Sequence, residues 1–498
     1  NIWVKPQVEK GKRMKRKFTT IIRCLAFLCL TLFLLVRYTG IMMSKQEMFC
    51  SVTLKQYERN TIDVLFLGSS QMIYAAQPMI LWEQYGITSY NMATSATTIP
   101  GNYWMAEISF ETQLPKVVML DCTFAYMETK TFNELPRIHS AIDGFWPSPA
   151  AYGAIHDLVE DPDKRFEFYW TPYIYHTRWK ELTEEDFTEV SDHGAGGAYL
   201  RNSVVNLDGT MRQYAKEEML EVPQINLEYI EKLMLLCREN GSELVLTVLP
   251  IPMCVDYQPV YNTLQKWAEE RGIPFINGYD DPAFWQLDYG TDFVDMAHLN
   301  IHGAKKSSAY IGNYLATHYE LGLHTDGQTR LFWDKRLEEY TSYRNSIWTC
   351  PTLSYGTAIT FSAEGNHTQY YGDSVGSSRV PDPSGIFTWT TGPRSDFYFY
   401  IEEPADALLQ INVQALQPLK DKTSRTVEIY INERYVSSLE VDAAECPAAL
   451  SVDIDEELWV SSGEQKLTLK YPDRSGAAFG AMSLDYTLGI QEIYLERK

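Results

Sequence analysis

Five short apolar runs in the first 280 residues constrain the fold of this chain more than any other feature. They occupy residues 62–67, 87–91, 116–121, 243–249 and 274–276. Helical patterns lie between several of them, at residues 101–111, 225–239 and 258–272. Short all-apolar runs are typical of strands that are buried on both faces. Their alternation with helices therefore predicts an α/β domain built on a parallel sheet.

The first of these runs ends in Gly68-Ser69-Ser70, which places a serine hydroxyl at the carboxyl end of a strand. Sites in parallel sheets lie at this edge. Much later, Asp295 and His298 follow each other at a spacing that one tight loop can hold. A serine needs an adjacent base to become nucleophilic, and the base needs a third group to fix its tautomer. We therefore predict a triad of Ser70, His298 and Asp295, although each motif alone is often an ordinary helix cap or surface turn.

The segment from residue 60 to about 320 resembles the SGNH/GDSL hydrolase family. Gly68-Ser69-Ser70 is similar to the family's first block, Gly-Asp-Ser, and Asp295-x-x-His298 is similar to its fifth block. The resemblance implies a flavodoxin-like parallel sheet, with Ser70 as nucleophile, His298 as base and Asp295 as its orienting group. The Gly-Ser-Ser variant, the His-Leu-Asn continuation and a preceding anchor are also similar to the D-alanine transfer protein of teichoic-acid D-alanylation and to related envelope O-acyltransferases.

The residues expected to bind the oxyanion depart from the family pattern. The second block normally offers a glycine N–H, but residues 90–97 contain no glycine. The backbone N–H of Ser95 or Ala96 can serve instead, beside that of Ser70, because every residue except proline keeps its donor. The third block, Gly-x-Asn-Asp, is replaced by Cys122-Thr123-Phe124. Losing one oxyanion donor typically slows a reaction roughly 10²- to 10³-fold, so a slow hydrolase, a transferase with altered geometry and a degenerate relative stay open.

An apolar run at residues 18–36 is about one membrane thickness long. Arg23 near its start can extend its charge to the membrane surface. Six cations precede it, which favours a cytoplasmic tail at residues 1–17, an anchor at 18–43 and an extracytoplasmic remainder: Lys10, Lys12, Arg13, Lys15, Arg16 and Lys17. A cleaved signal peptide is the rival interpretation, but no Ala-x-Ala site follows the run. Met14 would be a conventional start for such an anchor.

The exported part of the chain is strongly acidic. The formal net charge is −22, whereas the first 23 residues carry +7, which leaves −29 for the remainder. We therefore do not expect the binding of nucleic acid or of anionic lipid as a main role, because phosphate binding needs clustered cations. None of the eight cysteines shows a Cys-x-x-Cys spacing, and we expect neither a metal nor a cofactor. Cys350 and Cys446 can pair in an oxidising compartment, which the sequence does not decide.

The connection between residues 121 and 243 is far longer than an ordinary α/β connection. We expect an insertion at about 125–225 that carries lid or substrate-binding structure. Its aromatic residues could stack on sugar rings or line an acyl pocket, and the candidate substrate-binding residues are Trp170, His176, Arg178 and Trp179. A packed subdomain with these rings in its core is the more common arrangement. Residues 194–197, Gly-Ala-Gly-Gly, predict a mobile loop nearby.

The character of the chain changes at about residue 350. Helical periodicity fades, and alternating runs appear at residues 397–401, 408–413, 427–431, 466–471 and 490–495. Asn432-Glu433-Arg434 predicts a hairpin turn. We therefore expect an SGNH-like domain at 45–345 followed by a β-sandwich or jelly roll at 350–498. The second domain looks similar to carbohydrate-binding modules, although no motif makes that specific.

Together these patterns indicate a membrane-anchored, extracytoplasmic serine O-acyltransferase or esterase that acts on acyl groups of an envelope polysaccharide. Its partners would be an envelope glycan, an acyl donor and, by family analogy, a multi-spanning membrane acyltransferase. A deacetylase that transfers only to water is one alternative. A glycan-binding or assembly protein with a relic triad is another.

Overall fold

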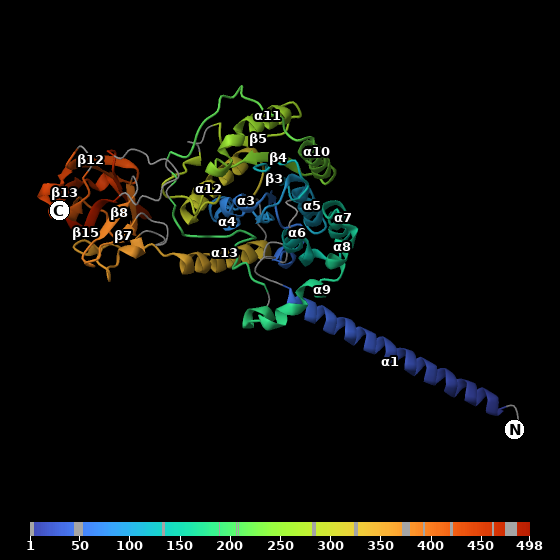
Figure 1. Cartoon of the computed structure of the whole chain (residues 1–498). Coiled ribbons are helices and arrows are strands. Elements are labelled where there is room, and N and C mark those ends of the chain that lie inside the picture. Colours follow the sequence, from blue (N-terminus) through green and yellow to red (C-terminus); the bar gives the residue numbers. More distant parts are fainter. Residues whose placement is uncertain are drawn as a thin grey trace.

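The computed structural model describes residues 4–43, 53–131, 135–188, 190–205, 207, 209–280, 285–322, 327–370, 379–391, 394–418, 422–460, 463–473 and 486–498. It begins with one long helix, α1 (Val4–Met42), which projects away from the rest of the molecule (Figure 1). Residues Arg16–Met42 of this helix are apolar enough to cross a membrane, and the apolar stretch of 18 residues that meets this criterion is not buried within the protein. Length and composition fit a single membrane span, and a signal sequence has the same properties.

A five-stranded parallel sheet forms the centre of the first domain. Its strands are β1 (Val64–Leu67), β2 (Ser89–Asn91), β3 (Val117–Asp121), β4 (Glu243–Val248) and β5 (Phe275–Asn277). They are ordered β2-β1-β3-β4-β5, and every pair is parallel. Every residue of β1 and β3 is buried, which explains their uninterrupted apolar sequences. The five strands predicted from apolar runs are thus confirmed to within two residues at each end.

The helices beside this sheet form two groups, and the helices within each group pack against one another (Figure 1). One group consists of α3 (Ser70–Ala75), α4 (Pro78–Tyr85), α12 (Ile301–His318) and α13 (Gly327–Ile347). The other contains α5 (Ile99–Phe110), α7 (Pro149–Leu158) and α10 (Gln224–Glu239), while α11 (Gln258–Glu269) contacts β5. The order of the strands reverses direction between β1 and β3, and doubly wound sheets bind their ligands at such a reversal.

The long connection between β3 and β4 contains several short helices, as its length predicts. They are α6 (Leu135–Ile142), α7, α8 (Pro162–Tyr169), α9 (Pro172–Tyr175) and the 3₁₀ helices η3 (His176–Lys180) and η4 (Glu184–Phe187). The first two of these pack near α5, whereas α9, η3 and η4 contact the end of α1.

The C-terminal domain consists of two antiparallel sheets that share one apolar core. One sheet has the order β13-β10-β15-β8-β7, with β6 beside β15, and the other has the order β12-β11-β14-β9. The strands are β6 (Ala358–Thr360), β7 (Arg379–Pro381), β8 (Thr388–Thr391), β9 (Arg394–Tyr400), β10 (Ala407–Leu416), β11 (Ser424–Ile431), β12 (Arg434–Asp442), β13 (Ala448–Ile454), β14 (Glu464–Lys470) and β15 (Tyr486–Arg497).

The predicted turn at Asn432 joins β11 to β12. Asn432 and Glu433 both adopt positive φ angles, 49° and 65°, as a two-residue hairpin turn requires. The side-chain oxygen of Asn432 accepts the backbone N–H of Lys466 at 2.9 Å, which ties this turn to β14.

The possible disulfide between Cys350 and Cys446 is not formed. Both thiols are free, with the Sγ atom of Cys350 near the carbonyl of Pro351 and that of Cys446 near the carbonyl of Asp442. Cys350 is buried at the start of the second domain, whereas Cys446 lies near the start of β13. The fold of the second domain does not bring the two thiols together.

Candidate active site

Ser70 is held at the carboxyl end of β1. β1 ends at Leu67, and after Gly68 and Ser69 the chain enters α3 at Ser70. Gly68 lies so close to its neighbours that a Cβ atom there would meet Met72 Cβ at 2.7 Å and Asp121 Cβ at 2.9 Å. A larger residue would push the strand away from β3, so glycine is required at this close approach.

Asp295 and His298 lie on a short hairpin between β5 and α12. The backbone N–H of Val294 donates to the carbonyl of His298 at 2.8 Å, and Phe293 pairs with Leu299 in an antiparallel bridge. At the tip, Asp295 Oδ1 accepts the backbone N–H groups of Ala297 at 2.8 Å and His298 at 3.0 Å. These bonds form an Asx turn, which orients the carboxylate toward the imidazole.

A continuous chain of hydrogen bonds joins the three side chains. His298 Nδ1 lies 2.9 Å from both carboxylate oxygens of Asp295, and His298 Nε2 lies 2.7 Å from Ser70 Oγ. The carboxylate favours a proton on Nδ1, so Nε2 is the acceptor and the serine hydroxyl donates to it. The structure thus brings together the three residues that the sequence analysis selected, across 228 positions between Ser70 and His298.

The charge on Asp295 is maintained by its hydrogen bonds. Partial burial by itself raises the pKa of this carboxyl group, but hydrogen bonds from the His298 ring and from two backbone N–H groups, together with the nearby charge of His298, outweigh burial and hold the pKa below its ordinary value. Asp295 therefore stays ionised at neutral pH, as a group that stabilises an imidazolium must.

Tyr74, which the sequence analysis missed, packs against the imidazole, and Arg201 packs against Tyr74. The centre of the Tyr74 ring lies 5.0 Å from the centre of the His298 ring. The guanidinium group of Arg201 lies 5.5 Å from the centre of the same Tyr74 ring. The carbonyl of Arg201 also accepts the N–H of Ile301 at 2.7 Å. Tyr74 follows Ser70 by one turn of α3, so this position could have been found from the helix that the Gly-Ser-Ser motif begins.

Asn91 occupies the end of β2, where the family pattern leads toward a glycine. Its side-chain amide donates to the carbonyls of Met72 at 2.8 Å and Ala76 at 2.9 Å. It therefore fastens α3, the helix that begins with Ser70, to the neighbouring strand. The backbone of Asn91 is also bonded, since its N–H donates to the carbonyl of Gly196 at 2.8 Å.

The glycine-rich segment at residues 194–197 is not the mobile loop that its composition predicts. The buried carboxylate of Asp192 accepts the N–H groups of Gly194, Gly196 and Gly197 and pairs with Arg336 at 2.7 Å. The glycines allow positive φ angles and a close approach to β2, because a Cβ atom on Gly197 would lie 2.1 Å from the carbonyl oxygen of Asn91.

Two of the expected oxyanion residues lie in the turn after β2. The N–H of Thr94 donates to the carbonyl of Gly68 at 3.3 Å, so this turn is fastened to the segment that precedes Ser70. Ala96 adopts a φ of 51°, which turns the backbone sharply. Ser95 and Ala96 also border a small pocket of about 40 Å³ with apolar walls from Met105, Ile138 and Leu158.

Asp121 is the last residue of β3 and directly precedes Cys122-Thr123-Phe124, the segment that stands in place of the third block. Its Oδ1 atom accepts the hydroxyl of Thr123 at 2.6 Å and the backbone N–H of Thr123 at 3.1 Å, while Oδ2 is buried without a partner among the described residues. Burial raises the pKa of Asp121 to about 7. The hydrogen bonds of this carboxyl group are thus made within its own turn, and the group is partly protonated near neutral pH.

We expect Asp121 to make the stability of the first domain depend on pH. Its folded pKa of about 7 exceeds the ordinary value, so the proton stabilises the folded state fully below about pH 4, and this contribution is lost as the pH rises toward 7. The Asp121→Asn variant should lose this pH dependence. Above pH 7, its free energy of unfolding should exceed that of the wild type by a few kcal/mol. Unfolding measured from pH 4 to 8 checks this, with the exposed Asp455→Asn as control; equal slopes for wild type and Asp121→Asn would contradict it.

The four candidate substrate-binding residues lie elsewhere. Trp170 follows α8, and His176, Arg178 and Trp179 lie in η3, beside the end of α1 (Figure 1). Arg178 Nη1 donates to the carbonyls of Met42 at 2.9 Å and Met43 at 2.7 Å. The structure does not bring these side chains into the hydrogen-bond chain of Ser70, and their role in substrate binding stays a prediction.

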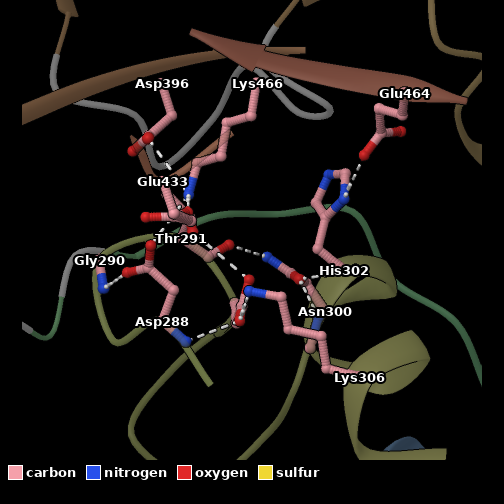
Figure 2. A network of polar contacts seen from close by, with 12 residues as sticks. Asp288, Gly290, Thr291, Asn300, His302, Lys306, Asp396, Glu433, Glu464 and Lys466 are labelled. Atoms are coloured by element: carbon pink, nitrogen blue, oxygen red, sulfur yellow. Dashed lines mark hydrogen bonds and ion pairs between the residues drawn. The ribbon is translucent and has the colours of Figure 1, made fainter. Parts of the chain in front are cut away.

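The base of the Asp295–His298 hairpin is held by the second domain (Figure 2). Asp288 pairs with Arg394 of β9, and its Oδ2 atom lies 2.9 Å from Lys466 Nζ of β14. Lys466 also contacts Glu433 at 2.8 Å and Asp396 at 3.3 Å. The carboxylates raise the pKa of Lys466 despite its burial, so its charge is retained.

The other side of the hairpin is fastened to α12. The fully buried carboxylate of Asp292 accepts Lys306 Nζ at 2.8 Å and the backbone N–H of Asp288 at 2.7 Å. Asn300 caps α12 by accepting the N–H of His302 at 3.0 Å, and its amide donates to the carbonyl of Thr291 at 2.6 Å (Figure 2). The hairpin tip with Asp295 and His298 therefore projects from a base with many polar bonds.

His302 has a structural role between the two domains. It is buried, its ring stacks on Tyr398 of β9 at 4.2 Å, and Nδ1 lies 3.6 Å from Glu464 (Figure 2). Burial, helped by nearby lysines, lowers its pKa to about 3. The ring is thus neutral and serves the contact between the two domains.

Comparison with known proteins gives only remote likenesses. No family model matches the chain. No curated protein matches it either.

Among solved structures, a two-domain esterase active on acetylated mannans is 11% identical, with 89% of this chain and 93% of that chain covered and a TM-score of 0.25. A GDSL-like lipase from Bacteroides thetaiotaomicron is also 11% identical, with coverages of 53% and 95% and a TM-score of 0.26. A family 35 carbohydrate binding module from Clostridium thermocellum is 8% identical and covers 29% of this chain and 100% of its own, with a TM-score of 0.19. These values are too low to assign a function, whereas the bonded chain of Ser70, His298 and Asp295 is a property of the molecule itself.

Proposed function

We propose that this protein is a serine esterase or acyltransferase of the SGNH type, which forms an acyl ester on Ser70. The observation that supports this is the continuous hydrogen-bond chain from Ser70 Oγ through His298 to Asp295 at the carboxyl end of a parallel sheet. Nucleophile, base and orienting group are each within bonding distance, which is the geometric requirement for an activated serine. A relic site would have no need to keep all three in register.

The reaction begins with attack on an ester or thioester carbonyl. Ser70 Oγ bonds to the carbonyl carbon while His298 Nε2 takes the hydroxyl proton, and Asp295 stabilises the resulting imidazolium. The N–H groups of Ser70 and of Ser95 or Ala96 are the proposed donors to the oxyanion. When the resulting tetrahedral intermediate collapses, the bond to the leaving group breaks. The leaving group receives the proton from His298 Nε2, and the acyl group remains on Ser70.

The second half of the reaction removes the acyl group from Ser70 and returns the enzyme to its starting state. A hydroxyl group of the acceptor loses its proton to His298 Nε2 as its oxygen attacks the acyl-serine carbonyl. Ser70 Oγ then leaves and recovers that proton. The acceptor is a sugar hydroxyl in transfer and water in hydrolysis, and both use the same residues. We propose an envelope polysaccharide as the glycan substrate.

We further propose that α1 anchors the protein in the cell membrane with the catalytic domain outside the cytoplasm. The cations from Lys10 to Lys17 precede the apolar span and favour a cytoplasmic N-terminus. The β-rich domain would hold the glycan or position the active site. A multi-spanning membrane protein that exports acyl groups would supply the donor in the transfer reaction.

A fluorophosphonate probe tests the proposal on the full-length protein in nanodiscs. Because Ser70 donates to His298, we expect the probe to modify Ser70 and the Ser70→Ala variant to remain unmodified. Ser69→Ala is the matched control, since Ser69 Oγ bonds to Gln71 and not to the histidine. Absence of the Ser70 adduct in folded wild-type protein would reject acyl-serine chemistry and favour a glycan-binding role.

A second measurement distinguishes transfer from hydrolysis. The protein is incubated with a chromogenic acyl ester, with and without oligosaccharide acceptors, and the products are identified by mass spectrometry. Acylated oligosaccharide that depends on Ser70 indicates a transferase. Free acid alone, unchanged by the acceptor, indicates the deacylating alternative.

A further inference from the structure

An exposed aromatic face lies beside the end of α1. Outside α1, six of the nine strongly exposed aromatic side chains among the described residues fall between positions 152 and 187: Tyr152, Phe166, Trp170, Tyr173, Trp179 and Phe187. Soluble surfaces rarely gather so many rings in one segment. Phe166 lies in α8 and Trp170 directly follows it, whereas Tyr173, Trp179 and Phe187 lie in α9, η3 and η4, which contact the end of α1 (Figure 1).

This segment is fastened directly to the end of α1. Arg178 donates to the carbonyls of Met42 and Met43, which are among the unsatisfied acceptors at the end of this helix. Its other guanidinium nitrogen pairs with Asp186 at 2.7 Å, and Asp186 accepts the N–H of Thr183 at 2.9 Å. The aromatic face is therefore held at a fixed height on α1.

That height corresponds to the outer boundary of a bilayer. The 27 residues of the span Arg16–Met42 measure about 40 Å at 1.5 Å per residue, which matches the hydrocarbon core plus the headgroup regions. Arg37 and Tyr38 lie in the last turns, where a cation and a phenol normally reach the headgroups. The exposed rings of Trp170 and Trp179 thus lie at the level where membrane proteins carry their aromatic belt.

A cavity of about 530 Å³ opens at the same level. One wall is the end of α1, at Leu35, Val36 and Thr39, and the other is formed by Trp146 and Trp170. An apolar cavity that is continuous with a membrane span has lipid as its neighbour. Its size and lining suit the upper part of one acyl chain.

We propose that residues 166–187, with the last turns of α1, form a binding surface for phospholipids of the outer leaflet. Trp170, Tyr173 and Trp179 insert among the headgroups, Lys180 beside the Trp179 ring offers a cation to phosphates, and the cavity takes an acyl chain. The inference rests on the proposed membrane anchor, and it adds that the catalytic domain lies against the membrane at a fixed orientation. This surface provides access to acyl donors delivered at the membrane.

Photocrosslinking in lipid nanodiscs tests the inference with the full-length protein. The reporter p-benzoylphenylalanine replaces one of three aromatic residues with similar exposure: Phe27 within α1, Trp179 on the aromatic face, or Tyr435 on β12 of the second domain. The nanodiscs contain phosphatidylglycerol and phosphatidylethanolamine, and lipid adducts are measured by mass spectrometry. We expect adducts at positions 27 and 179, with a yield at 179 about tenfold above that at 435.

Each pattern of adducts has a separate meaning. Adducts at position 27 without adducts at 179 overturn the lipid-binding surface but keep the anchor. Adducts at neither position overturn the anchor and, with it, the inference. In whole membranes, crosslinking of position 179 to another protein in place of lipid also overturns it. Arg178→Ala, which releases the segment from α1, should lower the yield at 179 and leave that at 27 unchanged.

Discussion

Replacing His298 by alanine is expected to slow acylation of Ser70 by about 10⁴-fold or more, because the serine loses the only base within bonding distance among the described residues. Asp295→Asn should cost about 10³- to 10⁴-fold, since an amide at this position favours the wrong tautomer of the imidazole. The rates are measured as pseudo-first-order labelling by the fluorophosphonate probe and as hydrolysis of a chromogenic acetyl ester.

The controls separate the role of the base from general damage. His318→Ala is the matched variant, because His318 is an exposed histidine on α12 whose ring bonds only to the carbonyl of Tyr314. It should label at the wild-type rate. Residues that act as a unit are not additive, so Ser70→Ala with His298→Ala should be no slower in ester hydrolysis than Ser70→Ala alone. Labelling of His298→Ala at the wild-type rate would remove His298 from the mechanism.

The features that the sequence predicted are those encoded locally. β1, β3 and β4 could be predicted because strands buried on both faces must be apolar at every position. Ser70, Asp295 and His298 could be predicted because a strand end and an Asp-x-x-His spacing are visible in the chain. The turn at Asn432 was visible for the same reason, since asparagine tolerates positive φ angles.

Contacts between distant segments could not be predicted in this way. β12 and β13 were missed because each exposes many of its residues and so shows little apolar alternation. The same limit applies to Asn91, whose amide holds α3, and to Asp192, whose carboxylate orders the glycine-rich segment. These side chains are polar, and only the fold shows that they are buried and bonded rather than solvated.

Replacing Lys466 by methionine is expected to have the second large effect, because this lysine joins the second domain to the hairpin that carries Asp295 and His298. Its side chain is 10% exposed, and its ammonium group contacts Asp288, Glu433 and Asp396. Removal of one partner from a buried ionic network typically costs about 3–5 kcal/mol, because the remaining charges lose their compensation. Methionine keeps a similar volume, so the loss should arise from charge.

The effect should appear at the hairpin as well as in the second domain. Asp288 begins the segment that ends at His298, so loss of Lys466 leaves Arg394 as the remaining cation on its carboxylate among the described residues. A cost of this size corresponds to roughly 10²- to 10⁴-fold more frequent local opening. Hydrogen exchange of residues 288–300 should accelerate accordingly, and labelling of Ser70 should slow.

Lys470→Met is the matched control for this experiment. Lys470 lies on the same strand, β14, but its ammonium group lies over the Tyr430 ring, 4.3 Å from the ring centre. The ion pairs of Asp288 among the described residues are with Arg394 and Lys466. Its loss should leave both exchange of residues 288–300 and labelling near the wild-type values. If Lys466→Met exchanges faster in β14 but not in residues 288–300, the network stabilises the second domain alone. If the hairpin also opens, the second domain takes part in positioning His298, and the two domains form one catalytic unit.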